Sequence, residues 1–471
     1  MVLILKNASK ILYKMQIIKE KIMEKIIVNA KNVTGKIKAL HGVCNVPWAS
    51  CTEELERNYL GLYKEAGIPY CRYHDMGGVR GGEVYVDIPN IFRDFDADET
   101  NPENYDFTFT DWLVNRCVEN GVEPFYRLGI TIENDNFYQN YYNEVPKDKH
   151  KWARICEHII AHYNEGWANG YKYNIEYWEI WNEPEVRGST HRCGDEQMWN
   201  GSAEDYFELY SISATYLKER FPNIKVGGYS SIGFYHVIQA GISPSQNVDH
   251  APDKVFTYFH DFMKYISARK IPLDFFSWHS YHCNPQGNAK MSVYVKTQLI
   301  RYGYPDCENI NDEWNPDTRN RGLLVDCSNI ASNMLAYQKN MLDKAMYYAL
   351  RLTSGYNGML HPITGKPLKA YYAFKAFNAI YRLENELETS STNADIYVGA
   401  AEKDGKLCLM ISNYLAEDKE IEVEIEGFSV KEAKINRVDE ENTYDESVLE
   451  ASSKLQLKLP AHAVYLLTFN K

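Results

Sequence analysis

The sequence predicts an α/β protein, a (β/α)8 barrel accompanied by a smaller all-β sandwich domain. Two observations lead to this fold class. Between about residues 36 and 384, short apolar strand patterns alternate with amphipathic helix patterns, as expected of βα units around a parallel sheet. After about residue 385, short strands and turns follow one another without a strong helix pattern. A chain of 471 residues, 45% of them hydrophobic, has room for both domains.

Eight strand patterns fill the first region, and eight repeats close a barrel. The strands are expected at residues 38–46, 69–75, 122–130, 175–182, 224–230, 273–281, 309–314 and 343–351. Helical patterns with apolar residues three and four positions apart lie between them, at residues 52–67, 150–166, 203–221 and 253–270, and residues 365–383 form the eighth helix. The segment 76–108 is rich in Gly, Asp, Asn and Pro and is expected to be a loop at the C-terminal end of the barrel.

The second domain is expected to be discontinuous. Residues 36–384 form the barrel, whereas residues 23–35 join residues 385–471 in the sandwich. The reason is the stretch KIIVNAKN at 25–32, which has no place in the eight-strand count and whose alternating pattern suits an edge strand of the sandwich. The sandwich itself is expected to buttress the barrel. Residues 1–22 are treated as an N-terminal extension to which no function is assigned, since Met15 and Met23 both precede the first strand.

The net charge and the cysteine pattern limit the classes of binding partner and the cellular setting that are expected. With 64 acidic and 51 basic residues, the net charge of −13 disfavours nucleic acid, acidic membranes and polyanionic glycans. No apolar stretch approaches the roughly 20 residues of a membrane helix. The ten cysteines form neither a CxxC pair nor a compact Cys/His cluster, so neither a zinc site nor a disulfide framework is indicated, and reduced thiols and a cytoplasmic setting are expected. No metal and no cofactor are expected. A homo-oligomer is compatible with these features.

Two glutamates at strand ends carry the chemistry. Glu183 follows the aromatic strand Tyr-Trp-Glu-Ile-Trp-Asn and precedes Pro184, which ends the strand. Glu313 ends the strand Ile-Asn-Asp-Glu and is followed by Trp-Asn-Pro. These are predicted strands four and seven, whose C-terminal ends face each other across the barrel mouth, where active sites of this fold lie.

Cleavage of a glycosidic bond needs two carboxyl groups with different protonation states. One carboxylic acid protonates the leaving oxygen, while the other, ionised, attacks the anomeric carbon or activates water. Like charges a few ångströms apart are expected to raise the pKa of one glutamate, which leaves a neutral acid beside an ionised nucleophile. A single strand-end glutamate is as easily a salt-bridge partner, but the pair in these contexts favours catalysis.

At these residues the sequence resembles the glycoside hydrolases of clan A, and within them family 39, which includes β-xylosidases and α-L-iduronidase. The resemblance spans most of residues 36–384. The family's acid/base motif, Trp-x-Phe-Glu-x-Trp-Asn-Glu-Pro-Asp/Asn, is matched at Glu179, Trp181, Asn182, Glu183 and Pro184, and the chain departs from it at Glu176, Trp178 and Glu185. The resemblance implies that Glu183 is the general acid/base, Glu313 the nucleophile and Asn182 the group that holds the sugar 2-hydroxyl.

Further strand ends are similar to family segments that contact the sugar. Arg72-Tyr73-His74 is similar to an Arg-x-His segment, which implies that His74 contacts sugar hydroxyls and Arg72 lies near the nucleophile. His279-Ser280-Tyr281 is similar to a His-x-Tyr segment, which implies that Tyr281 bonds the nucleophile and His279 faces the sugar. Histidines at such positions also commonly satisfy core hydrogen bonds.

Aromatic and outer residues complete the expected pocket. Trp314, next to the nucleophile, and Trp48, just past the first strand, are the best candidates for stacking on a pyranose. Four more residues are expected in outer parts of the pocket: Arg127, Glu133, Tyr347 and Arg351.

The expected function is therefore retaining hydrolysis of an oligosaccharide or glycoside, in the manner of an exo-acting β-xylosidase, with the loop 76–108 and the loop after His191 closing the pocket. Three alternatives stay open. The enzyme is endo-acting, with an open cleft; or it takes another sugar, such as an arabinopyranoside, glucoside, galactoside or iduronide; or the barrel binds carbohydrate without turning it over. The acidic charge disfavours a uronic acid, which calls for a cation aimed at the sugar carboxylate.

Overall fold

The computed structural model divides into two compact units. One unit contains residues 38–378, and the other combines the segment that ends at residue 37 with residues 379–471. The structure describes residues 23–45, 61–74, 86–131, 135–136, 139–140, 143–185, 198–239, 241, 254–349 and 356–471.

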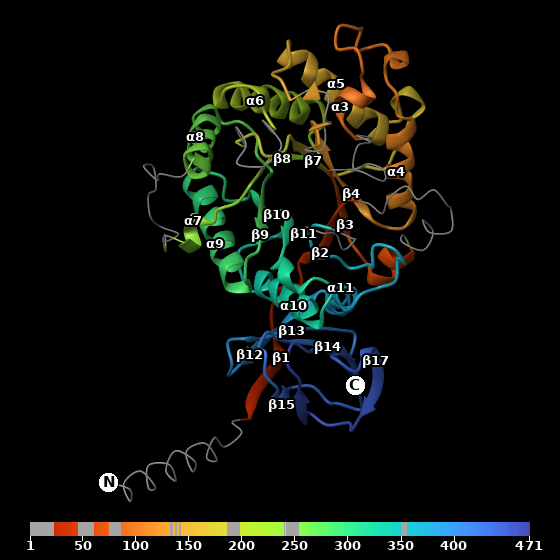
Figure 1. Cartoon of the computed structure of the whole chain (residues 1–471), viewed down its shortest axis with the longest axis vertical. Helices are drawn as coiled ribbons and strands as arrows, with labels where there is room; N and C mark the ends of the chain where they lie inside the picture. The colour runs from red at the N-terminus through yellow and green to blue at the C-terminus, as the bar shows by residue number, and fades with distance from the viewer. Residues whose placement is uncertain are drawn as a thin grey trace, which may run out of the picture. The chain divides into compact units, whose positions relative to one another are not determined.

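The larger unit is a closed barrel of eight parallel strands, which confirms the predicted fold class (Figure 1). The order around the barrel is β10-β11-β2-β3-β4-β7-β8-β9. Every neighbouring pair is parallel, so all eight carboxyl ends lie at one end of the barrel. The strands are β2 (Ala39–Cys44), β3 (Tyr70–Tyr73), β4 (Glu123–Leu128), β7 (Tyr177–Ile180), β8 (Lys225–Ser231), β9 (Phe275–Tyr281), β10 (Glu308–Asn315) and β11 (Lys344–Tyr347).

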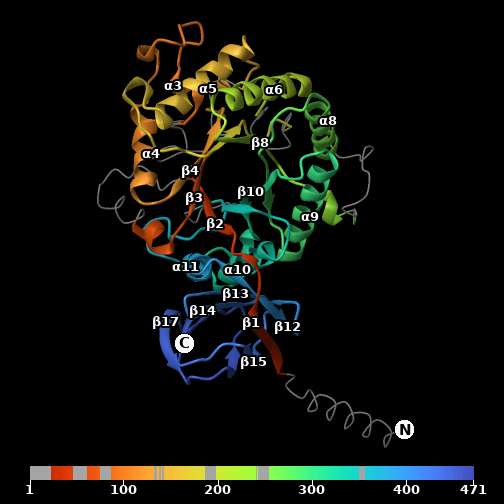
Figure 2. The same cartoon turned by 180° about the vertical axis from the view of Figure 1, so that it is seen from behind.

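Helices follow the strands and surround the barrel, as the views from the front and from behind show (Figures 1 and 2). The long helices are α4 (Thr108–Glu119), α5 (Lys149–Asn164), α6 (Ala203–Arg220), α8 (Lys254–Arg269), α9 (Pro285–Arg301), α10 (Leu324–Gln338) and α11 (Lys369–Tyr381). Local sequence explains their starts. Ser202 and Asp205 form a reciprocal capping box at the start of α6, and the Asp148 side chain accepts backbone N–H groups at the start of α5.

The expected loop 76–108 contains short helical segments in its described part. These are α3 (Ile88–Ile91) and η1 (Pro102–Asn104). The remaining short elements of this unit are α7 (His236–Gln239), η3 (Trp167–Asn169), η4 (Thr318–Asn320) and the two-stranded pair β5 (Asp135–Asn136) and β6 (Gln139–Asn140). Among the residues that the structure describes, no helix is both long enough and apolar enough to cross a membrane.

The barrel interior is apolar at one level and charged at the next. Buried side chains from five strands pack together in the apolar layer: Phe125, Tyr177, Phe275, Ile310 and Met346. Two residues further along four of these strands, the chain carries Arg127, Glu179, Ser277 and Asp312, all fully buried. Because strand side chains repeat with a period of two, these polar residues point into the barrel above the apolar layer, toward the carboxyl ends.

A β-bulge in β10 determines which way the candidate nucleophile points. Asn311 pairs with Trp278 of β9, but the next pair is Glu313 with His279, so Asp312 is an extra residue on β10. In a regular strand Asp312 would point inward and Glu313 outward. The bulge turns both carboxylates toward the barrel interior, which is the re-aiming that bulges produce beside active sites.

The smaller unit is all-β, a nine-stranded sheet in the order β17-β16-β19-β14-β13-β12-β1-β15-β18. Its inward side chains form one shared apolar core, as in a sandwich. The strands are β1 (Glu24–Lys36), β12 (Asn385–Ser391), β13 (Ile396–Lys403), β14 (Lys406–Asn413), β15 (Lys419–Glu426), β16 (Glu432–Val438), β17 (Thr443–Leu449), β18 (Lys454–Leu459) and β19 (Val464–Asn470).

The N-terminal strand β1 lies inside this sheet. It pairs antiparallel with β12 and parallel with β15, and Ile26 and Val28 are fully buried in the core. The expectation of an edge strand is therefore wrong, since the edges are β17 and β18. Alternation shows that one face of a strand is buried, but it does not show whether one or both edges are paired.

Candidate active site

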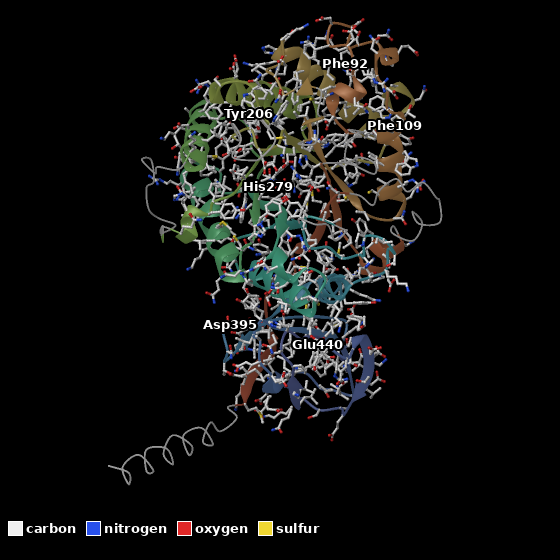
Figure 3. The ribbon with its side chains drawn as sticks, viewed as in Figure 1. Phe92, Phe109, Tyr206, His279, Asp395 and Glu440 are labelled. Atoms are coloured by element: carbon white, nitrogen blue, oxygen red, sulfur yellow. The ribbon has the colours of Figure 1, made fainter. Side chains whose placement is uncertain are left out.

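The candidate site lies where five barrel strands end. Arg72 comes from β3, Ser230 from β8, His279 from β9 and Glu313 from β10, while Glu183 follows β7. His279 marks the position of the site inside the ring of strands (Figure 3). The carboxyl ends of the strands thus bring together residues that are far apart in the sequence, as expected for this fold.

The segment that carries Glu183 leaves β7 in an unusual backbone conformation. Trp181 and Glu183 have φ angles of 74° and 47°, in the left-handed region that residues other than glycine adopt infrequently. Hydrogen bonds hold them there: Trp181 N–H donates to the Leu128 carbonyl at 2.7 Å, and Glu183 N–H to the Ser230 carbonyl at 3.1 Å. The strain, about 1–3 kcal/mol per residue, thus occurs at the residue expected to act as acid/base.

The Glu183 carboxyl has the protonation behaviour expected of a general acid. Its side chain is 13% exposed. Burial raises the pKa of Glu183 to about 7, against the lowering effect of the Arg72 charge. The expected direction is therefore found, but the cause differs, because the shift comes from lost hydration rather than from a like charge. Glu183 Oε1 lies 2.6 Å from His279 Nδ1.

Two hydrogen-bond donors hold the Glu313 carboxylate. Arg72 Nη1 donates to Oε2 at 3.1 Å, and the Tyr281 hydroxyl donates to Oε1. Burial, and then the charge of Glu313, raise the pKa of Tyr281, so that the phenol keeps its proton. A guanidinium and a phenol on the two oxygens favour the ionised form of the carboxyl group and fix its orientation.

Arg72 is the centre of the buried polar network. It is fully buried, and its Nη2 donates to Asn182 Oδ1 and to Ser230 Oγ, both at 2.7 Å. Its Nε lies 2.7 Å from Asp312 Oδ2 and donates to Glu179 Oε2 at 2.8 Å. One guanidinium thus joins residues from β7, β8 and β10 and supplies the positive charge that offsets their carboxylates.

Asn182 and His74 are two further buried polar residues at the carboxyl ends of the strands. Asn182 is 1% exposed, and among the described residues its Nδ2 has no hydrogen-bond partner. A buried amide N–H that lacks a protein partner is a donor for a substrate hydroxyl. His74 is also 1% exposed, and burial, with the charge of Arg72 beside it, holds its pKa well below the ordinary range. His74 is therefore neutral and able to donate or accept.

The tryptophans do not behave as expected. Trp314 is fully buried and packs edge-on against Tyr337 of α10 and Tyr347 of β11. Its expected stacking on a sugar is wrong, because the residue after an inward Glu313 points outward, between the barrel and its helices. Trp48 lies outside the described residues.

The two expected outer residues that the structure describes, Arg127 and Tyr347, do not lie at one pocket. Arg127 is fully buried and pairs with Asp87 at 2.5 Å, which ties the start of α3 to the barrel. Tyr347 packs on Phe374 in the helical layer and does not line the barrel mouth. Glu133 and Arg351 lie outside the described residues, as does the loop after His191.

Sequence reasoning missed two members of the site. Ser230 Oγ lies 2.5 Å from His279 Nε2 and 2.9 Å from Asp312 Oδ2. The sequence pattern marks Asp312 only as the strand residue before Glu313, and Ser230 only as the last residue of the strand expected at 224–230. Two adjacent acids at one strand end were the available signal for Asp312. Ser230 had none, since serine is common at strand ends.

Comparison with known proteins identifies the family. The model of glycosyl hydrolases family 39 matches residues 23–310. The chain belongs to glycosyl hydrolases family 39. The match includes the Asn182-Glu183-Pro184 segment and ends at Ile310, just before Glu313. The resemblance read from the motif is thereby confirmed, and this family 39 protein is a glycoside hydrolase.

Relatives of this family 39 hydrolase include enzymes described as beta-xylosidases. One from Caldicellulosiruptor saccharolyticus is 22% identical over 473 residues, which cover 90% of this chain and 86% of that protein. One from Geobacillus stearothermophilus is 25% identical over 215 residues, 43% of this chain and only 36% of the length of that enzyme.

Solved structures show the same fold. A glucosidase from Croceicoccus marinus superposes with a TM-score of 0.73 at 17% identity, covering 96% of this chain and 99% of that one. A monomeric beta-xylosidase from Caulobacter crescentus CB15 superposes with a TM-score of 0.66 at 16% identity, covering 95% of this chain and 99% of that one.

Proposed function

We propose that this family 39 hydrolase is a retaining, exo-acting β-glycosidase of the β-xylosidase type. The observation that carries the proposal is that two carboxyl groups on either side of one imidazole have different surroundings, which favour different protonation states. Glu183 is buried against His279 Nδ1, with its pKa raised to about 7. Glu313 receives a guanidinium and a phenol, and its Oε2 lies 3.6 Å from Nε2 of the same ring. A protonated acid beside an ionised nucleophile is the requirement of double displacement.

The reaction follows from these positions. Glu313 attacks the anomeric carbon while Glu183 gives its proton to the departing oxygen, which leaves a glycosyl ester on Glu313. Glu183, now ionised, then takes a proton from water, and the hydroxide formed releases the sugar with its original anomeric configuration. Arg72 and Tyr281 hold Glu313 in line, and the free amide N–H of Asn182 is placed to bind a sugar hydroxyl.

Three observations support a neutral xylose-type substrate. The two relatives compared above are described as beta-xylosidases. Arg72 is already offset by Glu179, Asp312 and Glu313, so that it does not attract a uronate. The net charge of −13 acts in the same direction.

A cavity lies beside the segment that carries Glu183. The cavity, of about 540 Å³, is lined by α3 with the turn after it, by residues 129–130 and 144–147, by Trp152 of α5 and by Trp181. Its size suits a small ligand. Trp181 directly precedes Asn182 and Glu183, while Phe92 of the α3 segment lies apart from His279 (Figure 3). The cavity therefore lies next to the segment that carries Glu183, outside the hydrogen-bond network around Arg72.

The free cysteines among the described residues favour a cytoplasmic setting for the enzyme.

A panel of aryl glycosides tests the substrate. The purified enzyme is incubated with 4-nitrophenyl glycosides of xylose, glucose, galactose, arabinose and iduronic acid, and the anomeric proton of the first product is followed by NMR. The β-xyloside is expected to give the highest kcat/KM, with a β-configured first product. An α-configured first product would refute retention. Faster turnover of the glucoside, arabinoside or iduronide would refute the proposed xylose specificity and identify the preferred sugar. No turnover of any glycoside, together with binding of xylobiose, would favour the non-catalytic alternative.

Two variants test the roles of the glutamates. Glu313→Gln is expected to abolish turnover of every substrate, whatever its leaving group. Glu183→Ala is expected to spare glycosylation by a 2,4-dinitrophenyl glycoside, which departs without a proton, and azide is expected to restore its turnover as a β-glycosyl azide. Glu119→Gln, at the exposed end of α4, is the control for handling. A β-glycosyl azide from the Glu313 variant, together with an inverted azide from the Glu183 variant, would reverse the two roles. The carboxyl groups are also expected ~5 to 5.5 Å apart in a crystal structure, whereas ~9 Å would indicate inversion.

A further inference from the structure

The hydrogen-bond partners of His279 differ at its two ring nitrogens. Nδ1 faces Glu183 Oε1 at 2.6 Å, and Nε2 faces Ser230 Oγ at 2.5 Å. The ring is fully buried, and burial lowers the pKa of His279 to about 4, so the imidazole is neutral at pH 7. A neutral imidazole carries one N–H, and therefore one nitrogen donates while the other accepts. Which one donates depends on Ser230.

The surroundings of Ser230 Oγ decide where protons lie. Arg72 Nη2, at 2.7 Å, has only protons to give. Asp312 Oδ2, at 2.9 Å, accepts a hydrogen bond from Ser230 Oγ and forms an ion pair with Arg72, whose Nε lies 2.7 Å away. A hydroxyl has one proton and two lone pairs. The Ser230 hydroxyl therefore donates its proton to Asp312 Oδ2. One of its lone pairs accepts a hydrogen bond from Arg72 Nη2, and the other accepts one from the N–H at His279 Nε2.

We propose that Ser230 is a positioning residue that fixes His279 as the Nε2–H tautomer, so that the bare Nδ1 accepts the proton of Glu183. This inference rests on the proposed role of Glu183 as acid/base. The proton chain runs from Glu183 Oε1–H to Nδ1, from Nε2–H to Ser230 Oγ, and from Ser230 Oγ–H to Asp312 Oδ2. Nδ1 stabilises the protonated acid and offers no proton to the carboxylate. Glu183 is thereby kept protonated before glycosylation, the first step, and stays basic enough to deprotonate water in deglycosylation, the second step.

Other charged and titratable groups around Glu183 and His279 do not alter this assignment. They come from β3, β7, β9, β10 and the segments after β3, β7 and β8: Arg72, His74, Glu179, Glu185, Tyr235, Tyr281, Asp312 and Glu313. The charge of Arg72 favours ionised Glu183 equally in both tautomers of His279, so it does not distinguish between them. Burial raises the pKa of Glu185 to about 8 and that of Asp312 well above its ordinary value. Because Asp312 Oδ2 faces the Arg72 guanidinium at 2.7 Å, a proton on this carboxyl group is carried by Oδ1, and Oδ2 stays the acceptor for Ser230.

The pH dependence of kcat/KM tests the proposal. Ser230→Ala and Ser230→Gly remove the hydroxyl, which frees His279 to carry its proton on Nδ1 and to donate it to ionised Glu183. The pKa of Glu183 then falls, so the alkaline limb for a phenyl glycoside is expected to move to lower pH by about one to two units. The limb is expected to be unchanged for a 2,4-dinitrophenyl glycoside when glycosylation is measured, because that step needs no acid. Glycine is included because Ser230 has a φ of 59°, which glycine adopts without strain.

Ser277→Ala is the matched control. Ser277 is an equally buried serine of the same network, with its hydroxyl on Glu179 Oε1 at 2.6 Å and its Oγ accepting Ser230 N–H at 2.9 Å, but its hydroxyl does not contact His279. Its loss is expected to lower activity without moving the alkaline limb. Equal limbs in the wild type and both Ser230 variants, or an equal shift in Ser277→Ala, would overturn the tautomer assignment.

A spectroscopic measurement separates this inference from the proposed function. In 15N-labelled enzyme, two-bond 1H–15N correlations distinguish protonated from bare ring nitrogens, and His279→Gln assigns the signals. Nδ1 of His279 is expected to be bare in the wild type and protonated in Ser230→Ala at pH 8. Wild-type inactivity on every glycoside would refute the proposed function alone, since this spectrum still reports the tautomer. A protonated Nδ1 in the wild type would refute the inference while leaving glycosidase activity intact.

Discussion

Replacing Glu183 by glutamine should make the barrel unit more stable, and increasingly so as the pH rises. The pKa of Glu183 is raised by burial from 4.5 to about 7. Below pH 4.5 the group is protonated in the folded and the unfolded chain, so it imposes no penalty. As the pH rises from 4.5 to 7, the unfolded chain releases a proton that the folded chain retains, and stability is lost. Glutamine does not titrate, and its amide can still donate to His279 Nδ1.

The expected magnitude follows from the shift. A displacement of about 2.5 pK units corresponds to about 3 kcal/mol once both states are ionised, and to about 2.5 kcal/mol between pH 5 and pH 8. At 13% exposure, solvent screens little of it. Burial also raises the pKa of Glu185 to about 8, but this group is present in both proteins and largely cancels in the difference.

Urea unfolding of wild type and Glu183→Gln at pH 5 and pH 8 measures the effect. The difference in unfolding free energy should grow in favour of the variant by about 2–3 kcal/mol between the two pH values. Glu119→Gln, at an exposed helix end, should show no such growth. An equal difference at pH 5 and pH 8 would mean that Glu183 titrates as an exposed glutamate, and the assignment of the acid by burial would fail.

Three further substitutions test the packing around the site and in the smaller unit. Arg72→Met leaves Glu179 and Asp312 buried without their cation, and should lower the unfolding free energy by about 3–5 kcal/mol; an unchanged urea midpoint would contradict the network. Trp314→Ala should destabilise by a similar amount, about 3–5 kcal/mol, without raising KM for the aryl glycosides, whereas a raised KM would restore its stacking role. Val28→Asp should unfold the all-β unit, seen as rapid proteolysis, while Val33→Asp, 56% exposed on the same strand, should be within about 0.5 kcal/mol of wild type.

The pattern along the chain determined the architecture and the two glutamates that are proposed to react. Apolar alternation and helical spacing are local properties, and they placed all eight barrel strands within a few residues of their observed positions. Parallel strands around a closed barrel then require their carboxyl ends to meet. The position of Glu183 after the fourth strand and of Glu313 on the seventh was therefore sufficient to assign both residues to one site.

Only the tertiary structure decided which way side chains point and what surrounds them. The direction of Glu313 depends on the bulge at Asp312, and a bulge arises from pairing with β9 that the sequence of β10 does not reveal. The same inward turn of Glu313 directs Trp314 outward, into the helical layer. For β1, the alternating pattern predicted that Ile26 and Val28 are buried. It did not predict that the strand is paired on both edges, because the second pairing is with β15, nearly 400 residues away in the chain.

The chemistry of the acid likewise required the folded barrel. The presence of two glutamates predicted that one would stay protonated, but the cause, burial of Glu183, is a property of the packed strands. Ser230 became visible only when β3, β8, β9 and β10 brought Arg72, His279 and Asp312 around its hydroxyl. A sequence lists the groups that can donate and accept protons; the distances that decide which of them do so exist only after the strands have closed.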